Sequence, residues 1–295
     1  MVLKLSMFAL VCATAAPGQP LADAVKARIG AFPGTVSIYA KNLDSGATFG
    51  VRETEPVRTA STIKLPILVS VFDAVERGQA KWTDKLTVTA PEKVSGTGVI
   101  GSEISDGVQL PLSDVAHLMI VLSDNTATNM ILQRFGADSV NAYLDRIGIK
   151  TTRSMRKILG QGKNEEGRSA AGKLPENQKY GIGMSTPKDM VTILERLERG
   201  ELVSADASRE MLAILKRCQD TGGIRRRIRG VPIANKTGAL DALRSDVGIV
   251  YSKGGRIALA ITVDGIPESN FTPDNEGLLL IADIARILVD GLAKH

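Results

Sequence analysis

Strand-like segments lie at the two ends of the chain, and a long helical stretch separates them. Residues 36–40 alternate in the manner of a strand, and a turn at 42–46 leads into a second such segment at 47–51. The strand pattern returns near the other end in three segments, at 231–237, 245–251 and 256–263. This order predicts an α/β (α+β) fold with a five-stranded antiparallel sheet built from both termini, flanking helices and an inserted all-helical domain.

The length and composition are those of a globular protein. The chain has 295 residues, of which 43% are hydrophobic and 23% charged, so it can bury a core as one large domain or as two closely packed ones. We expect a sheet-plus-helix domain from residues 16–60 and 205–295, and a mainly helical domain from residues 61–204. The polar, glycine-rich stretch at 153–183 has the length of a functional or disordered loop.

One dense basic run stands out in a chain whose net charge is only +5. It comprises Arg225, Arg226, Arg227 and Arg229. Because no aromatic residues are interleaved with it, we favour a solvated turn or helix face over a nucleic-acid site. We expect no nucleic-acid partner, and we expect the protein to act as a monomer.

The N-terminus has the pattern of a short secretory signal peptide. Lys4 precedes a mostly apolar stretch at 5–13, and Ala13-Thr14-Ala15 fits a small-x-small cleavage site. The stretch is too short to span a membrane as a permanent helix. We therefore expect residues 1–15 to be removed and the mature protein to be periplasmic or secreted, with no stable membrane insertion. A disordered or core-packed N-terminus is the alternative.

The cysteine and histidine content narrows the possible chemistry. Cys12 falls in the signal segment, and the mature chain then holds only Cys218, so neither an intramolecular disulfide nor a Cys/His metal cage is expected. The two histidines, His117 and His295, make a Ser-His-Asp triad hard to assemble. We expect no metal and no cofactor, and lysine is the expected base for any acyl transfer.

The tetrad Ser61-Thr62-Ile63-Lys64 opens a long apolar helix that is expected to reach Glu76. Residues three apart share a helix face, so the Lys64 amine can reach the Ser61 hydroxyl. A helix N-terminus also favours the negative charge that develops during nucleophilic attack. The same spacing recurs at Ser154 and Ser185, but neither of these serines precedes a long apolar helix.

Two further motifs follow in order, Ser123-Asp124-Asn125 between two helices and Lys236-Thr237-Gly238 on a predicted strand. Taken alone, the first is good turn and capping chemistry, and the second fits an exposed strand edge. The three motifs together resemble the signature of the penicillin-recognising serine hydrolases, which include class A β-lactamases and penicillin-binding D,D-peptidases. The resemblance covers about residues 21–292, including the loop Ser95–Val99.

The resemblance implies a role for each matching residue. Ser61 attacks the lactam or peptide carbonyl, Lys64 helps to deprotonate it, and Ser123 relays a proton to the departing nitrogen. The remaining implied contacts are made by Asn125 to the substrate amide, by Lys236, Thr237, Gly238 and Arg244 at the substrate carboxylate, and by the N–H groups of Ser61 and Ala239 as the oxyanion hole.

The sequence departs from the class A pattern at the deacylation step. Those enzymes activate water with a glutamate in a Glu-x-x-x-Asn loop, and this spacing is absent at 153–183. The loop offers Glu165, Glu166 and Glu176, all of which also fit solvated loop charges. A β-lactamase is therefore the first hypothesis. A penicillin-binding D,D-peptidase, an acylated sensor without turnover and an esterase for another small acyl substrate remain open.

Overall fold

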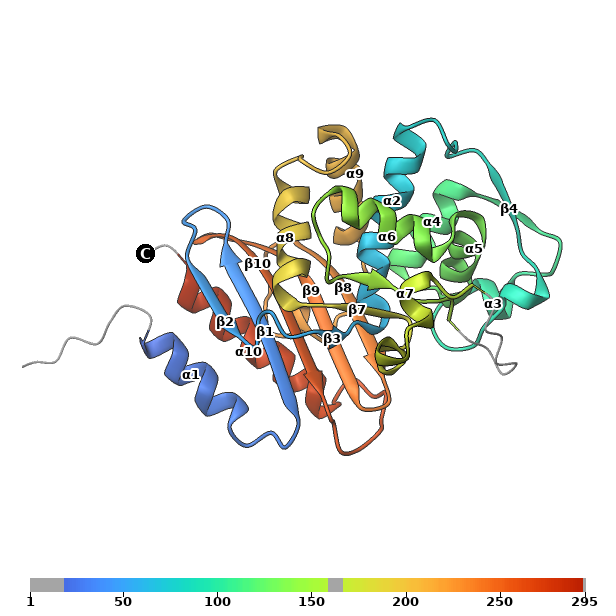
Figure 1. Cartoon of the computed structure of the whole chain (residues 1–295). Helices are drawn as coiled ribbons and strands as arrows, with labels where there is room; N and C mark the ends of the chain where they lie inside the picture. Colours follow the sequence, from blue (N-terminus) through green and yellow to red (C-terminus); the bar gives the residue numbers. More distant parts are fainter. Residues whose placement is uncertain (1–18, 159–166, 294–295) are drawn as a thin grey trace, which may run out of the picture.

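The computed structural model describes residues 19–158 and 167–293 (Figure 1). The predicted signal peptide lies outside these residues, as do Glu165 and Glu166. No helix within the described ranges is long and apolar enough to cross a membrane.

The largest sheet has five antiparallel strands, and both ends of the chain contribute to it. Its order is β2 (Thr48–Val51), β1 (Thr35–Asn42), β10 (Gly255–Asp264), β9 (Leu243–Ser252) and β8 (Ile233–Leu240). The predicted fold class is confirmed. The β8–β9 hairpin is longer than the sequence pattern suggested, because pairing continues to Leu240 opposite Leu243.

One face of the sheet is covered by the two terminal helices, α1 (Gln19–Ile29) and α10 (Glu276–Leu292) (Figure 1). Val25 of α1 and the apolar side of α10 are buried against sheet residues such as Ile38 and Leu259. Asn275 caps α10 by accepting hydrogen bonds from the first-turn N–H groups of Gly277 and Leu278. The two ends of the chain therefore pack as one layer.

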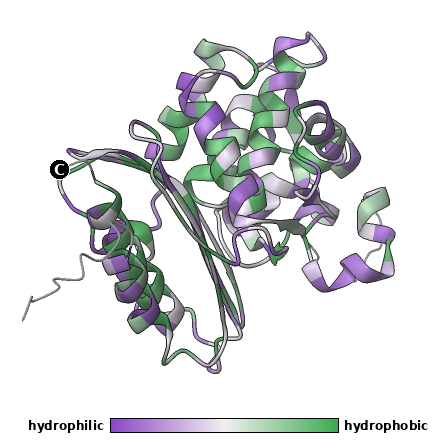
Figure 2. Cartoon of the chain, turned by 60° about the vertical axis from the view of Figure 1, so that its left-hand side comes forward, coloured by the Kyte–Doolittle hydropathy of each residue, from purple (hydrophilic) through white to green (hydrophobic). Residues whose placement is uncertain are grey.

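The opposite face carries the rest of the helices. The helix α8 (Pro187–Glu198) lies on β10 and β1, and α9 (Ala205–Lys216) lies on β8. Beyond them stand α2 (Lys64–Glu76), α4 (Leu112–Val121), α5 (Asn125–Phe135) and α6 (Ala137–Arg146). Figure 2 shows apolar residues concentrated where these helices meet one another and the sheet. The predicted helical segment 61–204 thus includes α8, which packs on the sheet.

Short elements connect these layers. They are β3 (Val57–Arg58), η1 (Ala60–Ile63), β4 (Lys85–Thr87), η2 (Ala90–Glu92), α3 (Ile100–Glu103), β5 (Gln109–Pro111), β6 (Arg153–Ser154), α7 (Ala170–Lys173), η3 (Pro175–Tyr180), β7 (Gly183–Ser185) and η4 (Ile224–Arg226). β6, α7, η3 and β7 lie in the stretch that was expected to be one long loop, so its described part carries secondary structure of its own.

Candidate active site

Ser61 lies at the point where the chain turns from the short strand β3 into the helical layer. The turn is made by Ala60, whose φ of 46° is in the left-handed region that non-glycine residues rarely adopt. Ser61 then belongs to the 3₁₀ turn η1, and the α-helix begins only at Lys64. The Thr62 hydroxyl stabilises this turn by donating to the Thr59 carbonyl at 2.8 Å. The predicted helix therefore starts one tight turn later than expected.

Gly238 allows β8 to approach this turn closely. A Cβ atom at Gly238 would lie 2.7 Å from the Thr59 carbonyl oxygen and 3.0 Å from the Ser61 nitrogen. The Ser61 N–H is thus held beside the edge strand of the sheet, and Ala239 is the next residue on that strand. This juxtaposition agrees with the predicted oxyanion hole of the Ser61 and Ala239 N–H groups.

Lys64 points its amine at the turn that joins α4 to α5. Its Nζ donates to the Ser123 carbonyl at 2.7 Å and to Asn125 Oδ1 at 2.9 Å, and it lies 3.2 Å from the Ser123 hydroxyl. Among the described residues, no hydrogen bond joins Lys64 to the Ser61 hydroxyl. These three contacts suit a neutral amine, because its two N–H groups serve the carbonyl oxygens and its lone pair can accept from the Ser123 hydroxyl.

Burial is the largest cause that lowers the pKa of Lys64 well below its ordinary value. The positive charge of Lys236 lowers this pKa further, whereas the carboxylate of Asp124 raises it. All three atoms within hydrogen-bond distance of the amine are uncharged oxygens. These surroundings favour the neutral amine, which is the form that a general base requires.

The turn that holds Lys64 is itself strongly constrained. Ser123 has a φ of 55°, a strained value for a serine. The next residue, Asp124, is fully buried, and its carboxylate accepts from the N–H groups of Val99, Ile100 and Ala127 at 2.7–2.9 Å. Asp124 thus caps α5 and fixes the preceding loop at the same time.

The loop Ser95–Val99 lies over this turn. Thr97 donates its hydroxyl to the Ser123 carbonyl at 2.6 Å, and Asn125 Nδ2 donates to the Ser95 carbonyl at 3.2 Å. A Cβ at Gly98 would overlap Asp124, so the close approach requires glycine there. The amide of Asn125 is therefore held between Lys64 and the loop.

Lys236 is also fully buried, on the sheet side of the site. Its Nζ donates to the Thr237 carbonyl at 2.8 Å. Burial lowers the pKa of Lys236, but Cys218, Asp220 and Asp246 oppose that shift by favouring the charged amine. Lys236 is thus better suited to act as a cation than Lys64.

Arg244 does not lie open to a substrate as a free guanidinium. It is buried, and it donates to the carbonyl groups of Leu240, Leu243 and Asn270. Its guanidinium carbon lies 4.7 Å from the centre of the Phe271 ring. Arg244 therefore ties the β8–β9 turn to the segment before α10, and its predicted role at the substrate carboxylate remains a prediction.

A cavity of about 790 Å³ opens beside the edge strand β8. Thr237, Gly238, Ala239 and Arg244 line it, together with Thr97. Arg226, Arg227 and Arg229 also line it, and Arg227 and Arg229 are exposed, as the sequence pattern predicted for a solvated turn. No local pattern could have indicated this position, because the proximity to β8 comes from the fold. Among the described residues, no group of three or more His, Cys, Asp or Glu side chains is arranged to bind a metal.

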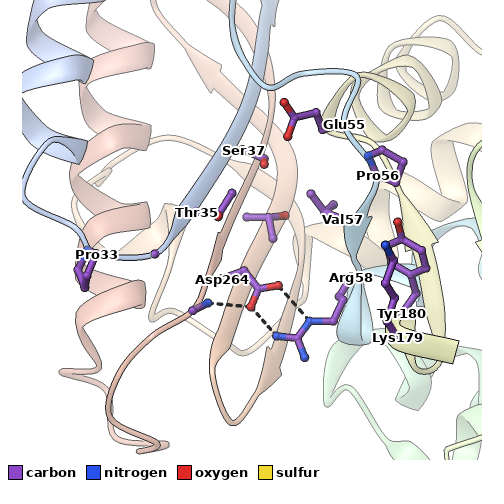
Figure 3. A pocket seen from close by; sticks show the side chains of 13 residues that line it. Pro33, Thr35, Ser37, Glu55, Pro56, Val57, Arg58, Lys179, Tyr180 and Asp264 are labelled. Carbon is purple, nitrogen blue, oxygen red and sulfur yellow. Dashed lines mark hydrogen bonds and ion pairs between the residues drawn. The ribbon is translucent and has the colours of Figure 1, made fainter. Parts of the chain in front are cut away.

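A second cavity, of about 600 Å³, is lined by residues of β1, β3, η3 and β10 (Figure 3). It contains none of the predicted site residues. Figure 3 shows Arg58 of β3 reaching Asp264 of β10, with Arg58 Nε 3.0 Å from the carboxylate. This ion pair joins the strand before Ser61 to the sheet.

Of the three candidate deacylation bases, only Glu176 falls within the described residues. It is exposed on η3, and the side chain of the neighbouring Asn177 donates to the Ala171 carbonyl at 3.0 Å. No interaction in the described part of the chain joins Glu176 to Ser61 or Lys64. The structure thus brings Lys64, Ser123 and Asn125 together and leaves Glu176 apart from them.

A sequence model of the Beta-lactamase enzyme family matches residues 20–292. The chain belongs to this family. It is 30% identical to a solved β-lactamase from Sphaerobacter thermophilus DSM 20745, with a TM-score of 0.79, 93% of this chain and 97% of that chain covered. It is 28% identical to the solved structure of PBP-A, with a TM-score of 0.76, 92% of this chain and 95% of that chain covered. Family membership confirms the resemblance that the three motifs carried.

One similar protein has a regulatory name. This chain is 23% identical over 294 residues to the β-lactamase regulatory protein BlaB of Streptomyces cacaoi. The match covers 88% of this chain and 93% of that protein. The proteins that this chain resembles thus include a β-lactamase, PBP-A and, by its name, a regulatory protein.

Proposed function

We propose that this protein is a class A-like serine β-lactamase that hydrolyses the β-lactam amide through a Ser61 acyl-enzyme. The observation that carries the proposal is the buried amine of Lys64, held by neutral oxygens of Ser123 and Asn125 one turn from Ser61. Because burial lowers the pKa of this amine, it is more readily neutral and able to accept a proton than an exposed lysine.

The acylation step follows from these positions. Ser61 Oγ attacks the lactam carbonyl carbon, its proton passes to Lys64 Nζ, and the new oxyanion is stabilised by the N–H groups of Ser61 and Ala239. Ser123 Oγ, 3.2 Å from Lys64 Nζ, then gives its proton to the lactam nitrogen as the amide C–N bond breaks. Lys64 returns a proton to Ser123, so that the step ends with a neutral amine and an ester on Ser61.

Deacylation requires a water molecule that attacks this ester. Glu176 is exposed on η3, which argues against it as the general base. Lys64 is neutral again after acylation, and its lowered pKa leaves it able to accept the proton of that water. We infer that Lys64 supports hydrolysis.

A penicillin-binding enzyme is the second candidate, and one comparison favours it. PBP-A, a 28% identical neighbour, was also solved as a leucine-to-glutamate variant in an acyl-enzyme complex with penicillin G. A covalent penicillin G adduct thus forms on a variant of a protein that resembles this chain, so a long-lived adduct is the outcome that this candidate predicts. The export predicted from residues 1–15 suits either activity, because β-lactams and peptidoglycan peptides both lie outside the cytoplasm.

An intact-mass time course with penicillin G tests the proposal, with hydrolysed product measured in parallel. A transient adduct on Ser61 with accumulating product supports a β-lactamase. A stoichiometric adduct that persists without product supports the penicillin-binding candidate. The absence of any adduct and any product contradicts both.

A further inference from the structure

We propose that the cavity beside β8 is a subsite for a negatively charged substituent of the substrate, and that Arg229 and Arg226 select for it. The inference rests on the proposed function and names a substrate class for it. The substituent is the one next to the ring carboxylate, at the C3 position of a cephalosporin.

The residues that line the cavity indicate which part of the substrate can enter it. Its wall includes Thr237, Gly238 and Ala239, which carry the predicted carboxylate and oxyanion contacts. The lining residues do not include Lys64, Ser123 or Asn125, which surround the acylation machinery. The cavity of about 790 Å³ therefore extends from the carboxylate end of the site, away from the acyl side chain.

The charge of the cavity is strongly positive. Four arginines line it, namely Arg226, Arg227, Arg229 and Arg244, against a single lining carboxylate, that of Asp220. Their surroundings differ, however, and only some of them are available to a ligand.

Two of the four arginines are committed elsewhere. Arg244 already donates to three carbonyl groups, and Arg227 is paired with Asp283. Both therefore contribute charge to the cavity more than free hydrogen-bond donors.

The other two are better placed for a ligand. Arg226 donates to the Pro273 carbonyl at 2.7 Å and pairs with Asp274, whose side chain is mostly exposed, so that this ion pair is weak. Arg229 is exposed, and within residues 19–158 and 167–293 it has no hydrogen bond or ion pair. An exposed guanidinium that lines a cavity together with three other arginines favours an anion.

Substrate chemistry identifies the anion. In a cephalosporin the C3 carbon is bonded to the carbon that bears the ring carboxylate, so both groups leave the ring in neighbouring directions. If Thr237 binds that carboxylate, the C3 substituent enters the cavity that Thr237 lines. Penicillins carry no corresponding substituent and cannot use the subsite.

Three cephalosporins with the same acyl side chain provide the test. Cefotaxime has a neutral C3 substituent, ceftriaxone an anionic one and cefepime a cationic one. The second-order rate of acylation, or kcat/KM where turnover occurs, is measured for each with the intact protein and with Arg229→Gln, Arg229→Lys and Arg226→Gln. Arg209→Gln is the matched control, because Arg209 is an exposed α9 residue paired with Asp206.

The ceftriaxone-to-cefotaxime rate ratio is expected to fall about three- to tenfold in Arg229→Gln, the effect of one charge at a solvated distance. Arg229→Lys should restore most of it, the cefepime ratio should not fall, and raising the ionic strength should shrink the difference. Unchanged ratios in both Arg229→Gln and Arg226→Gln, with all three compounds reacting, would overturn the subsite and leave the proposed function intact. No adduct with any of the three compounds would overturn both.

Discussion

Two fully buried lysines lie on opposite walls of the same site, and their surroundings give them different chemistry. Lys64, on the helical wall, has hydrogen bonds to uncharged oxygen atoms of the Ser123–Asn125 turn, and the carboxylate of Asp124 offsets only part of the fall in its pKa. Lys236, on the sheet wall, has Asp220 and Asp246 as neighbouring groups that favour its charge. The comparison shows that burial alone does not assign a lysine its role; the charges around the amine decide it.

The two walls are also coupled. The positive charge of Lys236 is the second largest cause that lowers the pKa of Lys64. Lys236, for which we predict a contact with the substrate carboxylate, therefore also favours the neutral form of Lys64. Substitutions on each wall can separate the effect of the Lys236 charge from the effect of the Lys64 base.

The largest expected effect comes from the nucleophile that both walls serve. Ser61→Ala should abolish adduct formation with penicillin G, because the substitution removes the hydroxyl that forms the acyl bond. Intact-mass spectrometry after prolonged incubation measures this directly. A covalent adduct in Ser61→Ala would show that a different residue is the nucleophile.

Removing the base on the helical wall should have the next largest effect. Lys64→Arg keeps much of the volume and the capacity to donate hydrogen bonds, but a guanidinium stays charged at accessible pH and cannot accept a proton. We expect the acylation rate to fall about 10²–10⁴-fold, which is the usual contribution of a general base. Stopped-flow acylation with a chromogenic cephalosporin measures the change, and thermal unfolding shows whether the variant is folded. A folded Lys64→Arg that acylates at the normal rate would remove Lys64 from its proposed role.

The sheet wall is tested through its effect on pH dependence. Replacing Lys236 by Met removes a positive charge near Lys64, so the pKa of Lys64 should rise. Acylation requires the neutral amine, and the acid limb of the pH–rate profile should therefore move to higher pH. Lys236→Arg, which keeps the charge, is the control and should leave that limb near its original place. An unmoved limb in Lys236→Met would show that the two walls are not electrostatically coupled.

The buried carboxyl group of Asp246, on the sheet wall, should make the free energy of unfolding depend on pH. Burial raises the pKa of Asp246 from its ordinary 3.8 to about 7, although hydrogen bonds from Asn235 and the Ile224 N–H oppose the shift. Between these two pH values the folded state binds a proton that the unfolded state has released. The free energy of unfolding should therefore decrease as the pH rises from about 4 to about 7, with the full stability present below that window and the loss complete above it.

The substitution Asp246→Asn introduces a side chain that cannot ionise but still offers an acceptor oxygen. This variant should therefore lose the part of the pH dependence that Asp246 supplies. Urea unfolding at several pH values between about 4 and 8 measures the slope for both proteins. Parallel curves for the two proteins would show that Asp246 does not titrate in this window.

The sequence pattern predicted the sheet better than the site geometry, for a physical reason. Alternation along a strand is a local property, so segments such as 36–40 and 256–263 could be recognised without knowledge of the fold. The left-handed φ of Ala60 and the 3₁₀ turn after it depend on the close packing of Gly238, which is distant in sequence. No local pattern indicates a contact of that kind.

The residues of the site were predicted by type and order, but their partners were not. The motifs identified Lys64 and Ser123 as one unit, and the structure joins them. Arg244 was predicted to bind substrate, whereas its hydrogen bonds go to backbone carbonyl groups that a sequence cannot reveal. Arg229 was interpreted as solvated. Its position at the cavity could not be predicted, because it depends on how the segment before β8 folds back beside that strand.

The smallest expected effect concerns Glu176, the described candidate for the deacylation base. The side chain is exposed on η3, and no interaction among the described residues links it to Ser61 or Lys64. Glu176→Gln should therefore leave both the acylation rate and the lifetime of the penicillin G adduct unchanged. A general base would by contrast lengthen that lifetime about 10²–10⁴-fold when neutralised. Single-turnover mass spectrometry separates the two outcomes, with Glu210→Gln on α9 as an exposed carboxylate control. A longer-lived adduct in Glu176→Gln alone would mean that η3 moves onto the acyl-enzyme and adds a third wall to the site.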